Sequence, residues 1–264
     1  VRGGGKVVKN AAGFDLPKLM VGSYGRLGVI TELTLKVYPR PSGAVTQLFD
    51  FRDARSARRA MQQLLAKPLP LAAVDLIPLD TQPLTWQLAV RFAAPLESLA
   101  TVAQRAQQIV GGDQSLMLGP APFDPLHTQP DEEADFWRGQ AQFVESHQSG
   151  FLVRVAMGPN DLLKLESARQ QRVPGCDVRY TGACSIAWLR GQTVEELTTL
   201  NSLLEELELS AVLVAASKQL CEGANEPPLD PRLATKPWLG STSWCELARR
   251  IQTAIDPQQR FVAY

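Results

Sequence analysis

The sequence predicts an α+β fold in which a wide antiparallel sheet carries helices packed on one face. Segments typical of strands and helices follow the order β-α-β-β-α-β twice between residues 44 and 216. The composition, 45% hydrophobic and 20% charged over 264 residues, is that of one or two packed domains. Seven of the 19 glycines fall in the first 40 residues, which indicates a separate unit ahead of the sheet.

Residues 1–43 are expected to form this first unit. Asp15 is suited to cap a short helix that follows it. A turn at residues 22–25 leads into a long strand over residues 27–38, where β-branched residues are frequent and polar and apolar residues alternate. The proline- and glycine-containing stretch 39–43 ends the strand and marks a crossing between domains.

Residues 44–220 are expected to form a second domain built from the two β-α-β-β-α-β cycles, each a ferredoxin-like unit. A proline-rich loop at 119–130 and an acid-rich helix at 131–145 separate the cycles. The expected strands are 44–51, 71–79, 86–93, 115–118, 151–157, 178–181, 185–190 and 211–216. The expected helices of the cycles are 53–66, 96–110, 161–170 and 194–207. Residues 221–264 are expected to hold a connecting loop to 243 and a short amphipathic helix at 244–255.

The charges balance overall but are unevenly placed. Basic and acidic residues both total 27, which argues against a disordered chain and a globally basic nucleic-acid binder. Residues 1–40 hold seven basic and two acidic residues, leaving 20 basic and 25 acidic residues for the rest. A basic, glycine-rich segment suits close approach of an anion to backbone N–H groups. Tight turns with solvated lysines explain the same composition, and both interpretations stay open.

No residue cluster predicts a metal site or a catalytic nucleophile. The four cysteines, at 176, 184, 221 and 245, form no C-x-x-C pair and are expected to be buried small hydrophobes. The two histidines, His127 and His147, flank the acid-rich helix without a clear third ligand. Neither a Rossmann glycine fingerprint nor a serine nucleophile elbow is present. No apolar run approaches the roughly 18 to 20 residues that a membrane helix needs.

Two motifs near the ends of the chain carry a family resemblance. The first reads Lys-Val-Val-Lys-Asn-Ala-Ala-Gly-Phe-Asp-Leu over residues 6–16 and Val-Gly-Ser-Tyr-Gly-Arg-Leu-Gly-Val-Ile-Thr-Glu over residues 21–32. The second reads Ala-Ile-Asp-Pro-Gln-Gln-Arg-Phe over residues 254–261. Together they resemble the FAD-linked oxidases of the vanillyl-alcohol oxidase type, with a PCMH-type flavin domain, and most of all the FAD-binding subunits of glycolate oxidases. The family pattern has Tyr and Thr where this chain has Phe14 and Arg26.

The resemblance implies a different role for each of three parts of the chain. Residues 1–43 would be the C-terminal part of a PCMH-type FAD-binding domain, residues 44–220 a substrate or cap domain, and residues 221–264 a linker and helix returning to the FAD domain. FAD would be the cofactor, contacted by Asn10, Gly13, Asp15, Gly22, Ser23, Gly25, Leu27, Gly28, Val29 and Ile30. Glycines suit this role because a backbone without Cβ can pass against a planar ring or a phosphate, although a turn and a bulge would use them equally well. No catalytic residue is assigned.

The resemblance also implies an activity. It points to oxidation of glycolate or a similar 2-hydroxy acid to the oxo acid, with electrons leaving through flavoprotein and iron–sulfur subunits of a glycolate oxidase. We expect a cytoplasmic location, peripheral at the inner membrane through those subunits, and no nucleic-acid partner. A non-catalytic scaffold that docks a flavoprotein or iron–sulfur partner is the alternative. Because the chain opens without Met inside a glycine-rich loop, we expect a truncated subunit, with an incomplete FAD site and no activity alone.

Overall fold

The computed structural model describes residues 15–80, 84–111, 115–122, 131–145, 149–158, 160–217 and 237–261, together with residues 220, 230 and 233. The chain divides into two compact units. The smaller unit comprises Val1–Pro39, Pro231–Pro237 and Thr242–Tyr264, and the larger comprises Arg40–Asp230 and Trp238–Ser241.

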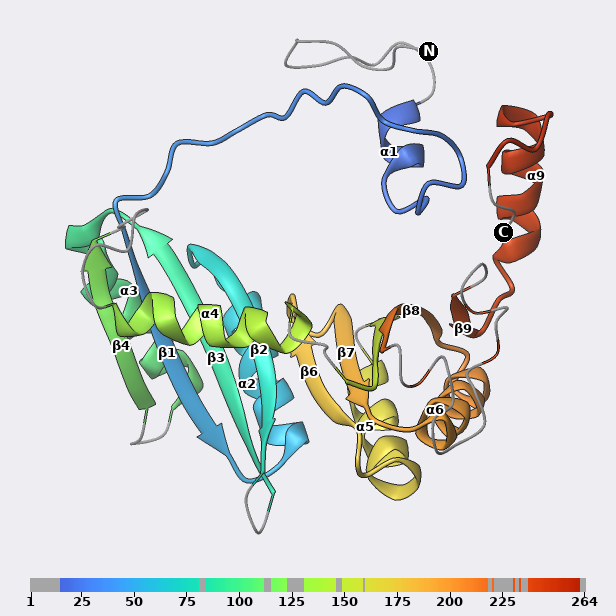
Figure 1. The fold of residues 1–264 in the computed structure, drawn as a ribbon. Helices are drawn as coiled ribbons and strands as arrows, with labels where there is room; N and C mark the ends of the chain where they lie inside the picture. The colour runs from blue at the N-terminus through green and yellow to red at the C-terminus, as the bar shows by residue number, and fades with distance from the viewer. Residues whose placement is uncertain are drawn as a thin grey trace. The chain divides into compact units, whose positions relative to one another are not determined.

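The larger unit is built on one antiparallel sheet, with nine strands in the described part of the chain. They are β1 (Gly43–Phe51), β2 (Leu71–Leu79), β3 (Thr85–Ala94), β4 (Ser115–Pro122), β5 (Phe151–Ala156), β6 (Asp177–Thr181), β7 (Ile186–Gly191), β8 (Ser210–Ala216) and β9 (Trp238–Gly240). Their order across the sheet is β4-β1-β3-β2-β6-β7-β5-β8-β9 (Figure 1). In each cycle the spatial order is therefore fourth, first, third, second, and the two ferredoxin-like units meet at β2 and β6. The predicted α+β class is confirmed.

The helices of the cycles form close to their predicted positions. They are α2 (Ala54–Leu65), η1 (Leu96–Ser98), α3 (Leu99–Val110), α5 (Asp161–Arg172) and α6 (Val194–Glu206). Asp53 begins α2 by accepting a hydrogen bond from the Ser56 backbone N–H at 2.8 Å. Thr193 and Glu196 form a capping box at the start of α6. Helices α2 and α3 lie behind the first four strands in Figure 1.

Helix α4 (Glu132–Glu145) covers the opposite face of the sheet, crossing in front of the first four strands (Figure 1). Its Phe136 and Trp137 pack against a buried apolar cluster on that face, made of Leu48, Ile77, Ala89 and Leu118. The indole N–H of Trp137 donates a hydrogen bond to Thr46 Oγ1 at 2.7 Å. The predicted packing on one face therefore describes α2 and α3 but does not extend to α4, the helix between the cycles.

The junction of the two ferredoxin-like units depends on side chains as well as on strand pairing. Strands β2 and β6 share one residue pair, Leu76 opposite Tyr180. The Tyr180 ring stacks on Trp86 of β3 with ring centroids 5.9 Å apart. The backbone N–H of Ala183, in the turn after β6, donates to the Val74 carbonyl at 2.8 Å. Tyr180 and Trp86 are buried, so the junction is part of the core.

The strand predicted at residues 27–38 is not formed. No described residue pairs with this segment through the backbone, and its large apolar side chains are exposed: Val29, Ile30, Leu33, Leu35, Val37 and Tyr38. Alternating polarity shows that a segment suits a strand, but the strand forms only when a neighbour takes up its hydrogen bonds. The prediction was wrong because it considered the segment without a partner.

Residues 238–240 form a strand that was not predicted. The sequence placed them in the connecting loop, but they pair with β8 as β9, with Gly240 opposite Ser210. Three residues are too few for alternation to be recognised in a sequence.

Candidate functional site

The predicted flavin contacts lie in the smaller unit, around helix α1 (Leu16–Met20) and the turn that follows it. The Asp15 carboxylate caps α1 by accepting from the Lys18 backbone N–H at 3.3 Å, and it pairs with Lys18 Nζ at 2.9 Å. The hydrogen bond with the Lys18 side chain lowers the pKa of the Asp15 carboxyl. Two further predicted contacts, Asn10 and Gly13, lie outside the described residues.

The turn after α1 leaves its glycine backbone open. Gly22 and Gly25 have φ angles of 80° and 76°, in the left-handed region that favours glycine. The Ser23 backbone N–H donates to the Met20 carbonyl at 3.2 Å, and the Arg26 N–H donates to the Ser23 carbonyl at 3.0 Å. No heavy atom of a described residue lies within 4 Å of the Cβ position at either glycine. A ligand can therefore approach the backbone there without meeting a side chain.

Residues 27–30 present a run of backbone donors. Within the described residues, no group accepts a hydrogen bond from the N–H of Leu27, Gly28, Val29 or Ile30. The Leu27 side chain is buried and holds this end of the turn in place, whereas the Val29 and Ile30 side chains are exposed. Successive N–H groups beside glycines suit the phosphates or the adenine edge of a dinucleotide. The residues present therefore fit one side of an FAD molecule.

The helix before the C-terminal motif contacts the glycine turn. Helix α9 (Cys245–Ile255) carries Gln252, whose side-chain amide donates to the Arg26 carbonyl at 2.9 Å. Both residues are buried. Past the helix, the buried Asp256 carboxylate accepts a hydrogen bond from the Phe261 backbone N–H at 2.9 Å. Helix α9, which leads into the C-terminal motif, is thus joined to the glycine turn through Gln252.

Comparison with known proteins gives partial matches. No family model matches the chain. The glycolate oxidase subunit GlcE of Escherichia coli (strain K12) is 44% identical over 77 residues, which cover 28% of this chain and 21% of that protein. The glycolate oxidase subunit GlcD of Bacillus subtilis (strain 168) is 34% identical over 77 residues, covering 29% of this chain and 16% of that protein. An uncharacterized FAD-linked oxidoreductase of Mycobacterium tuberculosis is 35% identical over 69 residues, covering 26% of this chain and 15% of that protein.

A solved structure extends the likeness to most of the chain. Alkyldihydroxyacetonephosphate synthase matches with a TM-score of 0.57 at 14% sequence identity, covering 97% of this chain and 50% of that chain. At this identity the likeness concerns the fold alone. Part of the chain is thus similar in sequence to FAD-linked oxidoreductases and glycolate oxidase subunits. This confirms the family resemblance drawn from the two motifs. The chain spans about half the length of the solved relative, and the sequence matches cover about a fifth or less of each curated one.

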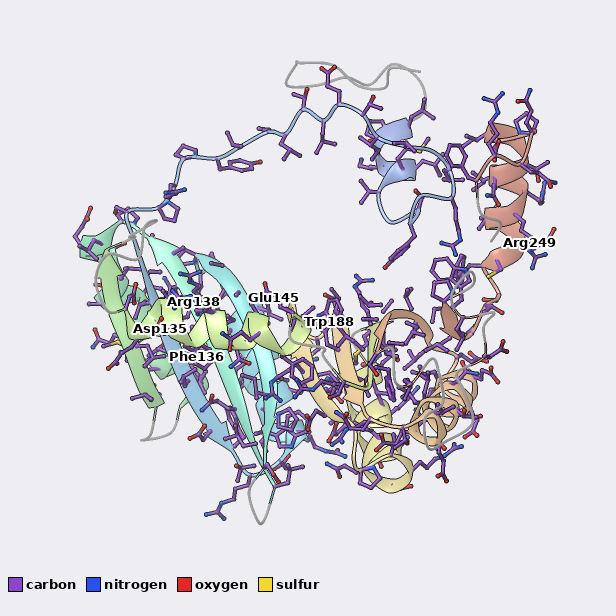
Figure 2. The ribbon with its side chains drawn as sticks, in the orientation of Figure 1. Asp135, Phe136, Arg138, Glu145, Trp188 and Arg249 are labelled. Carbon is purple, nitrogen blue, oxygen red and sulfur yellow. The ribbon has the colours of Figure 1, made fainter. Side chains whose placement is uncertain are left out.

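A basic patch on the sheet was not predicted from the sequence. Arg154 of β5, Trp188 of β7 and Arg179 of β6 lie opposite one another across three adjacent strands. Trp188 is labelled in Figure 2. Arg154 interrupts the otherwise apolar strand β5, which was a signal in the sequence. The register of three strands was needed to bring the side chains together.

The described cysteines carry no sign of reactivity. Cys176, Cys184 and Cys245 are buried. Burial raises the thiol pKa of Cys176 and of Cys184 to about 12. Both therefore stay protonated at neutral pH and are poor nucleophiles.

Asp75 of β2 is a buried carboxyl at the junction of the two ferredoxin-like units. Its side chain accepts a hydrogen bond from the Gly182 backbone N–H at 3.2 Å. Burial raises the pKa of this carboxyl to about 6, and the single hydrogen bond offsets only part of that effect. No described cluster of three or more His, Cys, Asp or Glu residues around it or elsewhere could hold a metal ion.

Glu133 of α4 is a second buried acid, and it is fully paired. Its carboxylate accepts from Thr46 Oγ1 at 2.7 Å and from Arg91 Nη2 at 2.8 Å. These bonds fix the start of α4 on the sheet.

None of the described helices is both long and apolar enough to span a membrane.

Proposed function

We propose that the chain is part of an FAD-dependent oxidoreductase of glycolate oxidase type, which oxidises glycolate or a similar 2-hydroxy acid to the oxo acid. The observation that carries this proposal is the glycine turn at residues 22–30, where Gly22 and Gly25 leave the backbone open and the N–H groups of residues 27–30 have no acceptor among the described residues. The turn lies within the motif that resembles the flavin domain of this family. The alignments with two glycolate oxidase subunits support the substrate class.

In this proposal the smaller unit holds one side of FAD. Gly22, Ser23, Gly25 and residues 27–30 would contact it through the backbone, and Asn10, Gly13 and Asp15 would complete this side. When bound, FAD supplies the two-electron acceptor for the oxidation of the hydroxy acid. The protein's own task is to position the cofactor and the substrate and to keep water from the reacting atoms.

We further propose that the chain alone binds FAD weakly and is inactive. Strong binding requires contacts that converge on a ligand and bury most of its surface. The glycine turn offers contacts along one side, and the side chains of Val29 and Ile30 beside it are 76% and 53% exposed. The rest of the enclosure would come from other parts of the protein or its complex.

The proposed partners are the flavoprotein and iron–sulfur subunits of a glycolate oxidase, which would carry the electrons away. The site of action would be the cytoplasm, with contact to the inner membrane through these subunits. A second candidate is a non-catalytic scaffold within the same complex. The exposed apolar side chains of residues 29–38 favour it, because a protein partner could cover them.

One experiment separates the two candidates. The chain is co-expressed with GlcD-like and iron–sulfur subunits, and glycolate-dependent reduction of an electron-accepting dye is measured. A Gly25→Val variant should abolish the activity if the glycine turn holds FAD, because valine is strained at a φ of 76° and would occupy the open space. Activity that needs the chain but survives Gly25→Val would support the scaffold. Activity that does not need the chain would contradict both.

A further inference from the structure

The three residues Arg154, Trp188 and Arg179, here called the basic row, share one face of the sheet. Trp188 lies opposite Arg154 in the pairing of β7 with β5, and opposite Arg179 in the pairing of β7 with β6. Directly opposed residues of antiparallel strands point to the same face. Neighbouring strands are about 4.8 Å apart, so two guanidinium groups flank one indole within reach of a single small ligand.

Positive charge exceeds negative charge around the basic row. A third arginine, Arg190, lies on the same face and pairs with Asp177 at 2.9 Å. Arg154 is half-buried, and no described residue forms a hydrogen bond or an ion pair with its side chain. Arginine side chains inside a sheet are normally paired with a carboxylate or another acceptor. Among the described residues, the one ion pair that these three arginines form is that of Arg190 with Asp177.

The donors of Arg179 are only partly used. Its Nη1 donates to the Val178 carbonyl at 2.9 Å, whereas the buried Nε has no acceptor among the described residues. Burial lowers the pKa of this guanidinium, and the charge of the neighbouring Asp177 offsets part of that effect. A buried donor without an acceptor is uncommon and needs an explanation. An anion bound at the basic row would supply one.

Helix α4 contacts two of the three arginines, Arg179 and Arg190. The ring of Phe143, near the end of α4, lies 4.9 Å from the Arg179 guanidinium carbon and 4.6 Å from that of Arg190. Phe143 is 6% exposed, so it is a platform for both groups. Guanidinium groups that are held before a ligand arrives lose less freedom on binding it.

We propose that the basic row binds a small carboxylate anion, with Arg154 as the main donor and Trp188 against the carbon skeleton of the ligand. The guanidinium fork matches the two oxygens of a carboxylate. The choice of a 2-hydroxy acid as the natural ligand rests on the proposed function, whereas the anion site itself rests on the arginines. An acidic segment of a protein is the competing occupant, and the half-buried position of Arg154 between two strands favours the small ligand.

The test is a calorimetric titration of the chain, without flavin, with oxalate and with its neutral counterpart oxamide. Oxalate is a suitable probe because it carries carboxylates and is not a substrate for oxidation of a hydroxyl group. We expect oxalate to bind with a dissociation constant near or below about 1 mM and oxamide not to bind. Replacement of Arg154 by glutamine should weaken oxalate binding about tenfold or more, the loss expected for hydrogen bonds to a charged group. Arg154→Lys should keep part of the affinity.

Arg172→Gln is the matched control, because Arg172 pairs with Glu206 through an ion pair between α5 and α6, away from the basic row. It should bind oxalate like the unmodified chain, and circular dichroism should show that both glutamine variants are folded. Equal affinity in Arg154→Gln and the unmodified chain, or no binding of oxalate at all, would overturn the proposal. Tighter binding of an acidic peptide than of oxalate would overturn the small-ligand assignment. Oxalate binding in a protein that proves unable to use FAD would leave this site standing and remove the proposed function.

Discussion

Replacing Asp75 with asparagine should change how the stability of the protein depends on pH. The Asp75 carboxyl is 9% exposed, and burial raises its pKa from 3.8 to about 6. A group with a raised acidic pKa favours the neutral form in the folded state. Asp75 therefore costs the folded protein no stability below about pH 4. The cost of ionising it grows between about pH 4 and 6 and is complete above that range.

The magnitude follows from the shift. A rise from 3.8 to about 6 is roughly two pKa units, and each unit corresponds to 1.36 kcal/mol, so ionised Asp75 costs about 3 kcal/mol. Asparagine has a similar shape and can still accept the hydrogen bond from Gly182, but it does not ionise. Its extra N–H group adds a cost that does not vary with pH. The free energy of unfolding of Asp75→Asn, relative to that of the unmodified protein, should therefore rise by about 3 kcal/mol from pH 4 to pH 7.5.

Urea unfolding of both proteins at several pH values between about 4 and 7.5 measures this difference directly. Asp50→Asn is the control, because Asp50 undergoes the same chemical change at an exposed position of β1. Its stability should follow that of the unmodified protein across the range. A difference for Asp75→Asn that stays constant with pH would refute the reasoning, since it would mean that Asp75 is not held in an environment that disfavours its charge.

Two further substitutions test the packing that supports the sites. Tyr180→Phe removes the buried hydrogen bond that the Tyr180 hydroxyl donates to Glu166 at 2.6 Å, and it should lower the free energy of unfolding by about 1–3 kcal/mol in urea titrations. No loss would mean that this bond does not help to hold α5 on β6. Glu133→Gln leaves the Arg91 guanidinium without its counter-charge, and it should destabilise the protein by a similar amount, about 1–3 kcal/mol. It should also shift the fluorescence of Trp137 to longer wavelength, whereas an unchanged spectrum would show that α4 stays seated without the ion pair.

The repeated sheet could be predicted from the sequence because each strand and helix of the cycles carries its own pattern. Leu197, Leu200 and Leu204 recur at helical spacing on α6, and the strands are bounded by turn residues. The face covered by α4 could not be predicted in the same way. It depends on Trp137 meeting Thr46, which lies 91 residues earlier in the chain.

The two candidate sites also differ in how far the sequence could predict them. The glycine turn could be found because its residues are neighbours in the sequence and form a recognisable motif. The basic row could not, since Arg154, Arg179 and Trp188 come together only through the register of three strands. The strand expected at residues 27–38 was wrong for a related reason, because pairing depends on a neighbour that a local pattern does not reveal.

The most direct test of the account is a nuclear magnetic resonance titration of the isotope-labelled chain with FAD. We expect the backbone amide signals of residues 22–30 to shift, those of Leu27 to Ile30 most, with a dissociation constant weaker than micromolar. Gly25→Val should remove these shifts while the signals of the sheet stay in place. Shifts confined to other parts of the chain, or none at millimolar FAD, would contradict the assignment of the glycine turn to the flavin.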